Sequence, residues 1–287
     1  MFTIIGIIVV FVAIIGGYLM EHGNLSVLWQ PAEFVIIFGA ATGAFIISSP
    51  KGVLQGVIKN IGKLFSSETV TKEDYMDLLM LLNQVFWKTR KEGLLALESD
   101  VDNPAGSEIF NGYPKIRSNP RILGFICDNL RVMISASMPS HELESLLETD
   151  IEALNHSKIV PAQSIAKVAD GLPGLGIVAA VLGVVLTMGM ISEPPEVLGH
   201  HIGAALVGTF LGVLACYGFV GPMGTNLEHK AKEEEIYFNV IKSALVSFQG
   251  GVAPQITIET ARRTIPADER PTFMEVEEAI KKSKARG

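Results

Sequence analysis

The sequence predicts an all-α integral membrane protein with four transmembrane helices, a large helical cytoplasmic domain between spans 2 and 3, and a helical C-terminal tail. Two observations predict this class: apolar residues gather in four long runs, and basic residues are absent from all four. The runs cover residues 2–20, 34–49, 171–192 and 199–222. At about 1.5 Å per residue, the third run extends for roughly 33 Å, which is enough to cross a hydrocarbon core of about 30 Å.

The distribution of Lys and Arg predicts how these spans are oriented. All 23 of these residues fall within residues 51–167 or from Lys230 onward. Because Lys and Arg are retained on the cytoplasmic side of a membrane, both termini and the central segment are predicted to be cytoplasmic. The first run has no basic segment before it and is longer than the apolar part of a signal peptide, so we expect it to be retained.

These assignments divide the chain into four parts. The parts are transmembrane helices 1 and 2 (1–50), a cytoplasmic helical domain (51–169), transmembrane helices 3 and 4 (170–222) and a cytoplasmic helical tail (223–287). Within the helical domain, Thr71 and Asp74 have the spacing of a capping box and predict the start of a helix. Gly93 predicts a break or kink in that helix, and Gly250 and Gly251 predict the end of the helix that begins the tail.

Small side chains form a stripe along each of the last two spans. The stripes are Gly176, Ala180, Gly183 and Thr187 on the third span, and Ala204, Gly208, Gly212 and Ala215 on the fourth. Helices in lipid associate largely through close backbone approach at small residues. Such stripes are explained if the two spans simply pack together. The flanking Pro173 and Pro222 and the lone hydroxyl of Thr209 favour instead a site between helices.

No enzyme motif, metal site or nucleic-acid-binding pattern is present in the sequence. The glycine-rich segment 171–176 does not match GxGxxG and follows no strand, so it does not predict a nucleotide loop. Adjacent His200 and His201 would point about 100° apart on a helix, which favours an exposed pair over a metal site. The net charge of −7 argues against nucleic-acid binding, and we expect no cofactor.

The spans also lack the groups that carry protons through membranes. Such carriers use an intramembrane Asp, Glu or His, and we expect none of these at mid-depth in any of the four runs. If the chain conducts ions, a partner must therefore supply the carboxylate. The small-residue stripes and Thr209 would then form a wall around the partner's helix, although a threonine in a span often bonds the carbonyl one turn back instead.

Charged residues cluster near the end of the first long helix of the cytoplasmic domain. The cluster comprises Lys88, Arg90, Lys91, Glu92, Glu98 and Asp100. By its charge alone, this cluster is typical of an ordinary solvated helix face. The glycine-rich spans in turn predict that the chain forms homo-oligomers, because such helices rarely stand alone in a bilayer.

Several longer motifs resemble those of a known family. They are Lys88-Thr89-Arg90 with Leu97-Glu98, residues 103–114, residues 172–185, residues 207–219 and Glu269-Arg270-Pro271-Thr272-Phe273. Together they cover nearly the whole chain and resemble MotA, the stator subunit of the bacterial flagellar motor. The resemblance implies a ring of five copies around two MotB chains in the bacterial inner membrane. A MotB aspartate would take up protons, and proton flow would drive rotation of the ring.

The resemblance also implies roles for individual residues. Arg90 and Glu98 would engage the rotor protein FliG, and Pro173 and Pro222 would act as hinges. Thr209 would line the ion pathway. Sodium-driven relatives have a threonine at the position of Ala180, so the alanine here resembles the proton-driven kind. The chain departs from relatives at 174–175, where Gly-Leu replaces Ala-Phe.

Three alternatives to a proton-driven stator remain at this stage. A sodium-driven stator differs only in the ion. An energy-transducing proton channel subunit of the ExbB or TolQ kind would also surround a partner helix, but it would have three spans and an external N-terminus. A membrane scaffold without ion flux is the third.

Overall fold

The computed structural model describes residues 2–65, 70–136 and 138–284, and every regular element in these ranges is helical. Within them, four helical stretches are long and apolar enough to cross a membrane, as the sequence predicts. Two compact units are formed. The first contains Met1–Glu68 and His156–Ala231, and the second contains Thr69–Asn155 and Lys232–Gly287.

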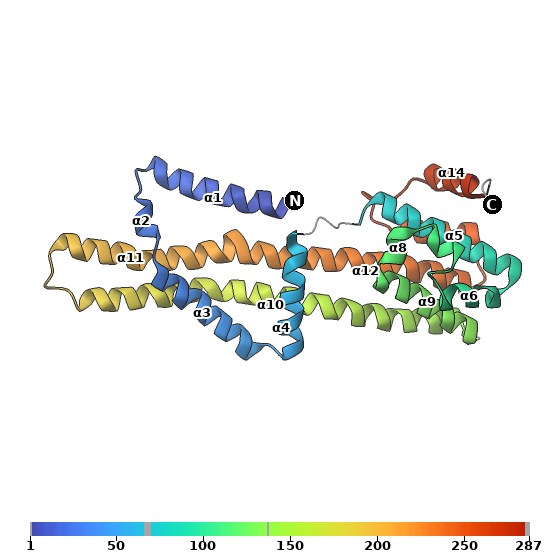
Figure 1. Ribbon diagram of the computed structural model, residues 1–287, viewed down its shortest axis with the longest axis horizontal. Coiled ribbons are helices and arrows are strands. Elements are labelled where there is room, and N and C mark those ends of the chain that lie inside the picture. Colours follow the sequence, from blue (N-terminus) through green and yellow to red (C-terminus); the bar gives the residue numbers. More distant parts are fainter. Residues whose placement is uncertain (1, 66–69, 137, 285–287) are drawn as a thin grey trace. The chain divides into compact units, whose positions relative to one another are not determined.

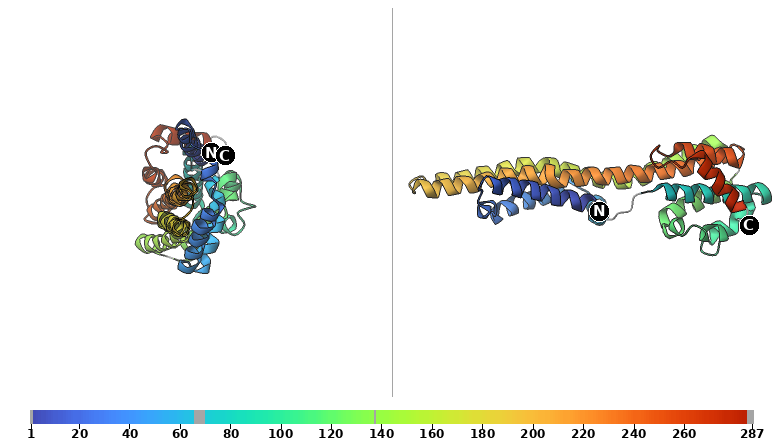
Figure 2. Two further views of the ribbon diagram at one scale, coloured as in Figure 1. Left: turned by 90° about the vertical axis from the view of Figure 1, so that its left-hand side faces the viewer. Right: turned by 90° about the horizontal axis from the view of Figure 1, so that it is seen from above.

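The first unit contains the predicted spans. Its helices are α1 (Phe2–Met20), α2 (Leu25–Leu28), α3 (Pro31–Ser48), α4 (Lys51–Ile61), the short η1 (Gly62–Phe65), the C-terminal part of α10 (Ser140–Met188), α11 (Pro195–Leu214), η3 (Ala215–Val220) and the start of α12 (Gly221–Gln249). Figures 1 and 2 show α10 and α11 side by side, joined by a turn after Met188 to form a hairpin. Pro195 opens α11 at its first position, where its missing N–H has no helical partner to lose.

The second span is longer than the apolar run that indicates it. Pro31 starts α3, three residues before the run at 34–49, and α2 lies just ahead of it. Consequently Glu33 belongs to the first turn of this span. On its inward face α3 buries Ile37 and Ala41, which pack against apolar side chains of α10 and η3.

The third span is the end of one very long helix. The apolar run from residue 171 covers only the last part of this helix, because α10 is continuous from Ser140 to Met188. Pro161 and Pro173 lie inside it. A proline inside a helix cannot donate to the carbonyl four residues earlier, so the helix forgoes one hydrogen bond at each position.

A π-helical segment, η3, separates the fourth span from α12. It covers the six residues before Gly221, and Pro222 follows at the second position of α12. Because Pro222 has no N–H, regular bonding to the carbonyl of Gly218 is impossible. The wider turns of η3 therefore lie where the sequence predicts a proline bend, and π-helical turns of this kind are frequent at functional sites.

Span α1 makes few contacts with the rest of the first unit. None of its residues is buried. Phe11 lies against Phe219 with ring centroids 4.9 Å apart, and the hydroxyl of Thr3 donates to the carbonyl of Leu64 at 3.2 Å. Most of the large apolar side chains of α1 are exposed, so this helix is suited to contact lipid or another protein.

The second unit is a helical domain with its own apolar core. Its helices are α5 (Lys72–Glu92), η2 (Leu94–Leu97), α6 (Glu98–Asp102), α7 (Glu108–Asn111), α8 (Pro114–Ser118), α9 (Pro120–Ser135), the N-terminal part of α10, most of α12, α13 (Pro254–Thr264) and α14 (Phe273–Lys284). The core is continuous across α5, α9, α10 and α12. The rings of Phe86 and Phe248 stack in it with centroids 4.4 Å apart.

The capping-box and glycine patterns of this unit form the helix starts and ends that they predict. Thr71 and Asp74 form both bonds of a capping box at the start of α5. Gly93 ends α5 with φ +89°, and Gly251 follows the end of α12 with φ +81°. Both backbone angles lie in the region that favours glycine.

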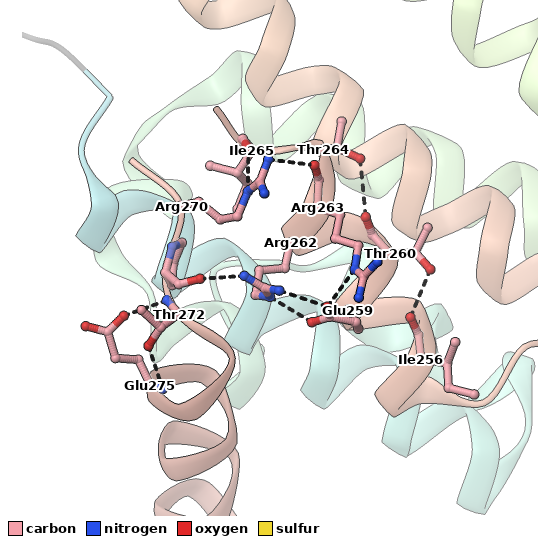
Figure 3. Close-up of polar contacts among 11 residues, drawn as sticks. Ile256, Glu259, Thr260, Arg262, Arg263, Thr264, Ile265, Arg270, Thr272 and Glu275 are labelled. Atoms are coloured by element: carbon pink, nitrogen blue, oxygen red, sulfur yellow. Dashed lines mark hydrogen bonds and ion pairs between the residues drawn. The ribbon is translucent and has the colours of Figure 1, made fainter. Parts of the chain in front are cut away.

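A polar network joins α13 to α14 (Figure 3). Glu259 accepts hydrogen bonds from Arg262 at 2.7 Å and from Arg263 at 2.8 Å. Arg262 also donates to the carbonyl of Pro271 at 2.9 Å, and Arg270 donates to that of Ile265 at 2.9 Å. The bonds from Arg262 and then Arg263 lower the pKa of Glu259 from 4.5 to about 2.

Candidate functional site

The α10–α11 hairpin is packed backbone to backbone at glycines. A Cβ placed on Gly176 would lie 2.7 Å from the carbonyl oxygen of Gly208, and one placed on Gly212 would lie 2.5 Å from that of Leu172. Farther along the hairpin, a Cβ on Gly183 would lie 2.6 Å from the Cβ of Ala205. Only glycine fits such contacts, because real Cβ atoms do not approach so closely.

This packing corrects the predicted role of the small-residue stripes. The glycines of the two stripes face each other inside one chain, so they are not the wall that surrounds a partner helix. The simpler explanation, that the two spans pack together, therefore holds for them. Thr187 likewise is buried and donates to the carbonyl of Gly183 at 2.8 Å, one turn back.

Ala180 and Thr209 lie at the same level of this hairpin. A Cβ on Gly208 would be 3.1 Å from the backbone nitrogen of Ala180, and Thr209 is the next residue along α11. Both Ala180 and Thr209 are half-buried. The structure therefore brings together the two positions that the resemblance assigns to the ion pathway.

The faces of the hairpin that remain open are apolar. On α10 they include Ile177, Val181, Val185 and Leu186, and on α11 they include Ile202, Leu206 and Val213. No Lys, Arg, Asp or Glu occurs in residues 171–192 or 199–222. These faces therefore suit lipid tails or apolar helices of other chains.

Glu33 of α3 is the functional candidate that the sequence reasoning missed. Its side chain reaches the hairpin at Gly208, where a Cβ would lie 2.6 Å from Oε2, and at Gly183, where a Cβ would lie 3.8 Å from Oε1. Gly208 is roughly 14 Å of helix from Gly199 and roughly 21 Å from Pro222. A carboxyl group is thus present at mid-depth, contrary to expectation, because α3 crosses the hairpin with its first turn.

The two candidate hinge prolines lie in different surroundings. Pro173 is half-buried inside α10, next to Leu172, whose carbonyl contacts α11 at Gly212. Pro222 is exposed and follows η3. Each therefore interrupts helical bonding at the same end of the hairpin, away from its turn.

Arg90 and Glu98 are both exposed and lie on either side of one tight turn. Arg90 is in the last turn of α5, Gly93 reverses the chain, and Glu98 begins α6. Between them Leu97 inserts into the core with 1% of its surface exposed. We call this segment, residues 88–100, the charged corner.

An ion pair inside the charged corner joins its two ends. Lys88 Nζ lies 2.6 Å from Asp100 Oδ2, and Asp100 Oδ1 accepts a hydrogen bond from Ser107 at 2.6 Å. Asp100 is 8% exposed. Within the predicted charge cluster, Lys88 and Asp100 thus form an ion pair that stabilises the charged corner, whereas Arg90 and Glu98 project from it.

Comparison with known proteins identifies the family. The family "Motility protein A N-terminal" matches residues 4–93, and the "MotA/TolQ/ExbB proton channel family" matches residues 122–239. The chain is 43% identical over 281 residues to Motility protein A of Salmonella typhimurium, which covers 98% of this chain and 95% of that protein. The chain belongs to the motility protein A family. Chemotaxis protein LafT of Vibrio parahaemolyticus is 37% identical over 273 residues, with 95% of this chain and 96% of that protein covered.

Solved structures share the fold of this motility protein A family member. The structure of C. jejuni MotAB matches with a TM-score of 0.79 at 20% identity, covering 94% of this chain and 98% of that one. The flagellar MotAB stator complex from Bacillus subtilis matches with a TM-score of 0.76 at 24% identity, covering 95% and 99%.

Family membership confirms the resemblance inferred from the sequence. This motility protein A family member is a multi-pass membrane protein with helical structure throughout its described residues, and it belongs to a proton channel family. Its four candidate spans fit that family better than the three-span ExbB or TolQ alternative.

Proposed function

We propose that this chain assembles as a homopentamer around two copies of a single-span partner of the MotB kind, in the bacterial inner membrane. The partner supplies an intramembrane aspartate and an anchor to the cell wall. Protons crossing at that aspartate drive rotation of the pentamer, which turns the rotor protein FliG. The observation that carries this proposal is the absence of Asp and Glu from residues 171–192 and 199–222 of the α10–α11 hairpin, which include Ala180 and Thr209. The chain that carries this hairpin belongs to the motility protein A family.

The hairpin around Ala180 and Thr209 indicates that a partner supplies the carboxylate, because these two apolar runs contain no acid of their own. Ala180 and Thr209 lie at the same level of the hairpin and are half-buried, whereas Glu33 is enclosed by helices of its own chain. An ion that passes along the open face therefore needs an acid from elsewhere. The Thr209 hydroxyl can accept or donate a hydrogen bond to water in that path.

The orientation follows from the basic residues. Both termini and the second unit lie in the cytoplasm, because every Lys and Arg is outside the hairpin turns. This places the turn after Met188 outside and the charged corner on the rotor side.

Charge reversal at the corner tests rotor engagement. Arg90→Glu and Glu98→Lys are expected to assemble and to conduct protons, yet to abolish rotation, because both side chains are exposed and neither is part of the Lys88–Asp100 tie. Swimming and tethered-cell rotation are measured beside proton current of the purified complex. Glu152→Lys, an exposed reversal on α10, serves as the control and keeps rotation. Normal swimming by both corner variants contradicts the role.

Proton coupling is tested by changing the ion. The small side chain at Ala180 favours the proton-driven kind over the sodium-driven one. We expect the current of the reconstituted complex to be unchanged when sodium is replaced by potassium and to follow the pH difference across the membrane. A current that requires sodium would assign the chain to the sodium-driven kind, and no current at all would indicate a scaffold.

A further inference from the structure

Glu33 is a carboxyl group enclosed by three helices of the first unit. Its side chain is only 8% exposed, and Oε2 is buried without a hydrogen-bond partner among the described residues. The glycine at position 208 provides the space, since a side chain there would overlap Oε2. An acid at the third position of a helix often bonds back to the N-cap, but the N-cap Gln30 has no such side-chain bond here.

No basic group faces this carboxyl from the helices packed against it. The apolar runs of α10 and α11 contain no Lys, Arg, Asp or Glu. The nearest titratable side chains on α11 are His201 and His200, about 10 and 12 Å of helix away from Gly208. On α10, Asp170 is about 20 Å of helix from Gly183. Cys216 of η3, about 12 Å of helix from Gly208, is also buried.

The surroundings accommodate the neutral acid and not the carboxylate. An ionised carboxylate without a partner cation or donors is strongly disfavoured in an apolar site. Glu33 is also at the level of Ala180, because the space beside Gly208 contains both Glu33 Oε2 and the Ala180 backbone nitrogen. A proton held at Glu33 is thus at the same level of the hairpin as Ala180.

We propose that Glu33 is a second proton-holding site of the channel, which receives a proton from the outer side and returns it toward the hairpin wall. The step transfers one proton to and from a carboxylate oxygen and changes no other bond. The inference rests on the proposed proton path. It assigns to this chain a titratable group in addition to the acid that the partner supplies.

Two measurements on the complex with its partner test the proposal. Proton flux is followed in vesicles of bacterial lipid with an internal pH-sensitive dye while the external pH is varied. Infrared difference spectra of the same complex, recorded after pH steps, report the C=O stretch of protonated carboxyls. In Glu33→Gln we expect that band to lose one component and the flux to fall about a hundredfold, the lower range for a positioned proton-transfer group.

Matched variants separate proton transfer from packing. Glu33→Asp keeps an acid and is expected to restore part of the flux with a shifted dependence on external pH, which a purely structural role would not produce. Glu196→Gln, at the exposed start of α11, is the control and leaves both readouts unchanged.

The outcomes decide between the proposals. If Glu33→Gln conducts with the flux and pH profile of the unmodified chain, the relay is refuted, whatever happens to the infrared band. If the unmodified complex carries no proton current, the proposed function fails instead. The infrared band then still decides whether Glu33 holds a proton, and an unaltered band in Glu33→Gln refutes that as well.

Discussion

At the scale of single residues, glycine positions decide how closely the spans approach. Gly208 meets both the carboxyl of Glu33 and the backbone of α10, whereas Gly174, two residues before Gly176, has nothing within 4 Å of its Cβ position. Two glycines in the same hairpin therefore differ in their tolerance to substitution. The stripe pattern in the sequence separates the two, because Gly208 belongs to a stripe and Gly174 does not.

Alanine substitutions at these glycines should have opposite effects. Gly208→Ala forces a Cβ to within 2.6 Å of Glu33 Oε2 and 3.0 Å of the Ala179 Cβ, so we expect destabilisation by about 1–3 kcal/mol from overpacking. Gly174→Ala should stabilise α10 by up to about 1 kcal/mol, because alanine is the better helix former. Thermal unfolding in detergent measures both. Equal effects of the two substitutions would contradict the packing described.

The ion pair and the hydrogen bond of Asp100 give a second prediction at the scale of single residues. Asp100→Asn removes the ion pair with Lys88, which is partly buried, and weakens the bond from Ser107. We expect a loss of about 1–3 kcal/mol in unfolding free energy, because a charge-assisted bond at a buried site is replaced by a neutral one. Denaturant unfolding monitors the loss. Asp102→Asn, which affects the more exposed ion pair with Arg131, is the control and should cost less than about 1 kcal/mol.

At the scale of elements, prolines and the π-helical segment locate where the spans can bend. Pro173 removes one backbone hydrogen bond within the continuous helix α10, and η3 with Pro222 replaces regular α-helical bonding between α11 and α12. Both interruptions fall near the end of the hairpin opposite its turn. A hinge between the spans and the cytoplasmic helices requires irregular bonding at that level, and both helices provide it.

Replacing one proline tests this hinge. Pro173→Ala restores a backbone donor and should stabilise α10 by up to about 3 kcal/mol, while slowing rotation if bending at this level drives the motor. Pro161→Ala is the matched control, because Pro161 also lies inside α10 but outside the apolar run. It should show a gain in stability without loss of speed in tethered cells. Equal rotation by both variants would remove the hinge role of Pro173.

At the scale of the whole molecule, the second unit is sensitive to acid through the α13–α14 network. The pKa of Glu259 is lowered to about 2, so its stabilising effect is complete above its ordinary pKa of 4.5 and is lost as the pH falls through about 2. The network is partly exposed, so we expect Glu259→Gln to cost about 1 kcal/mol at neutral pH after solvent screening. Circular dichroism between pH 5 and pH 2 should show a shallower loss in this variant than in the unmodified chain.

Most of the architecture follows from local sequence patterns. Uncharged runs predict the four spans, and the capping box and Gly93 predict the bounds of α5. Each of these signals lies within a single element, where periodicity and backbone preference suffice to determine the structure. The resemblance to stator subunits also depends on continuous motifs, and family membership confirms it.

The sequence by itself therefore determined the helices, the number of spans and the family. Only the tertiary structure decided that the glycine stripes face each other, that Lys88 and Asp100 hold the charged corner, and that Glu33 is buried at mid-depth. The physical reason is that these facts depend on contacts between separate elements. A side chain near a helix start, such as Glu33, looks like an interfacial acid until the neighbouring helices are in place around it.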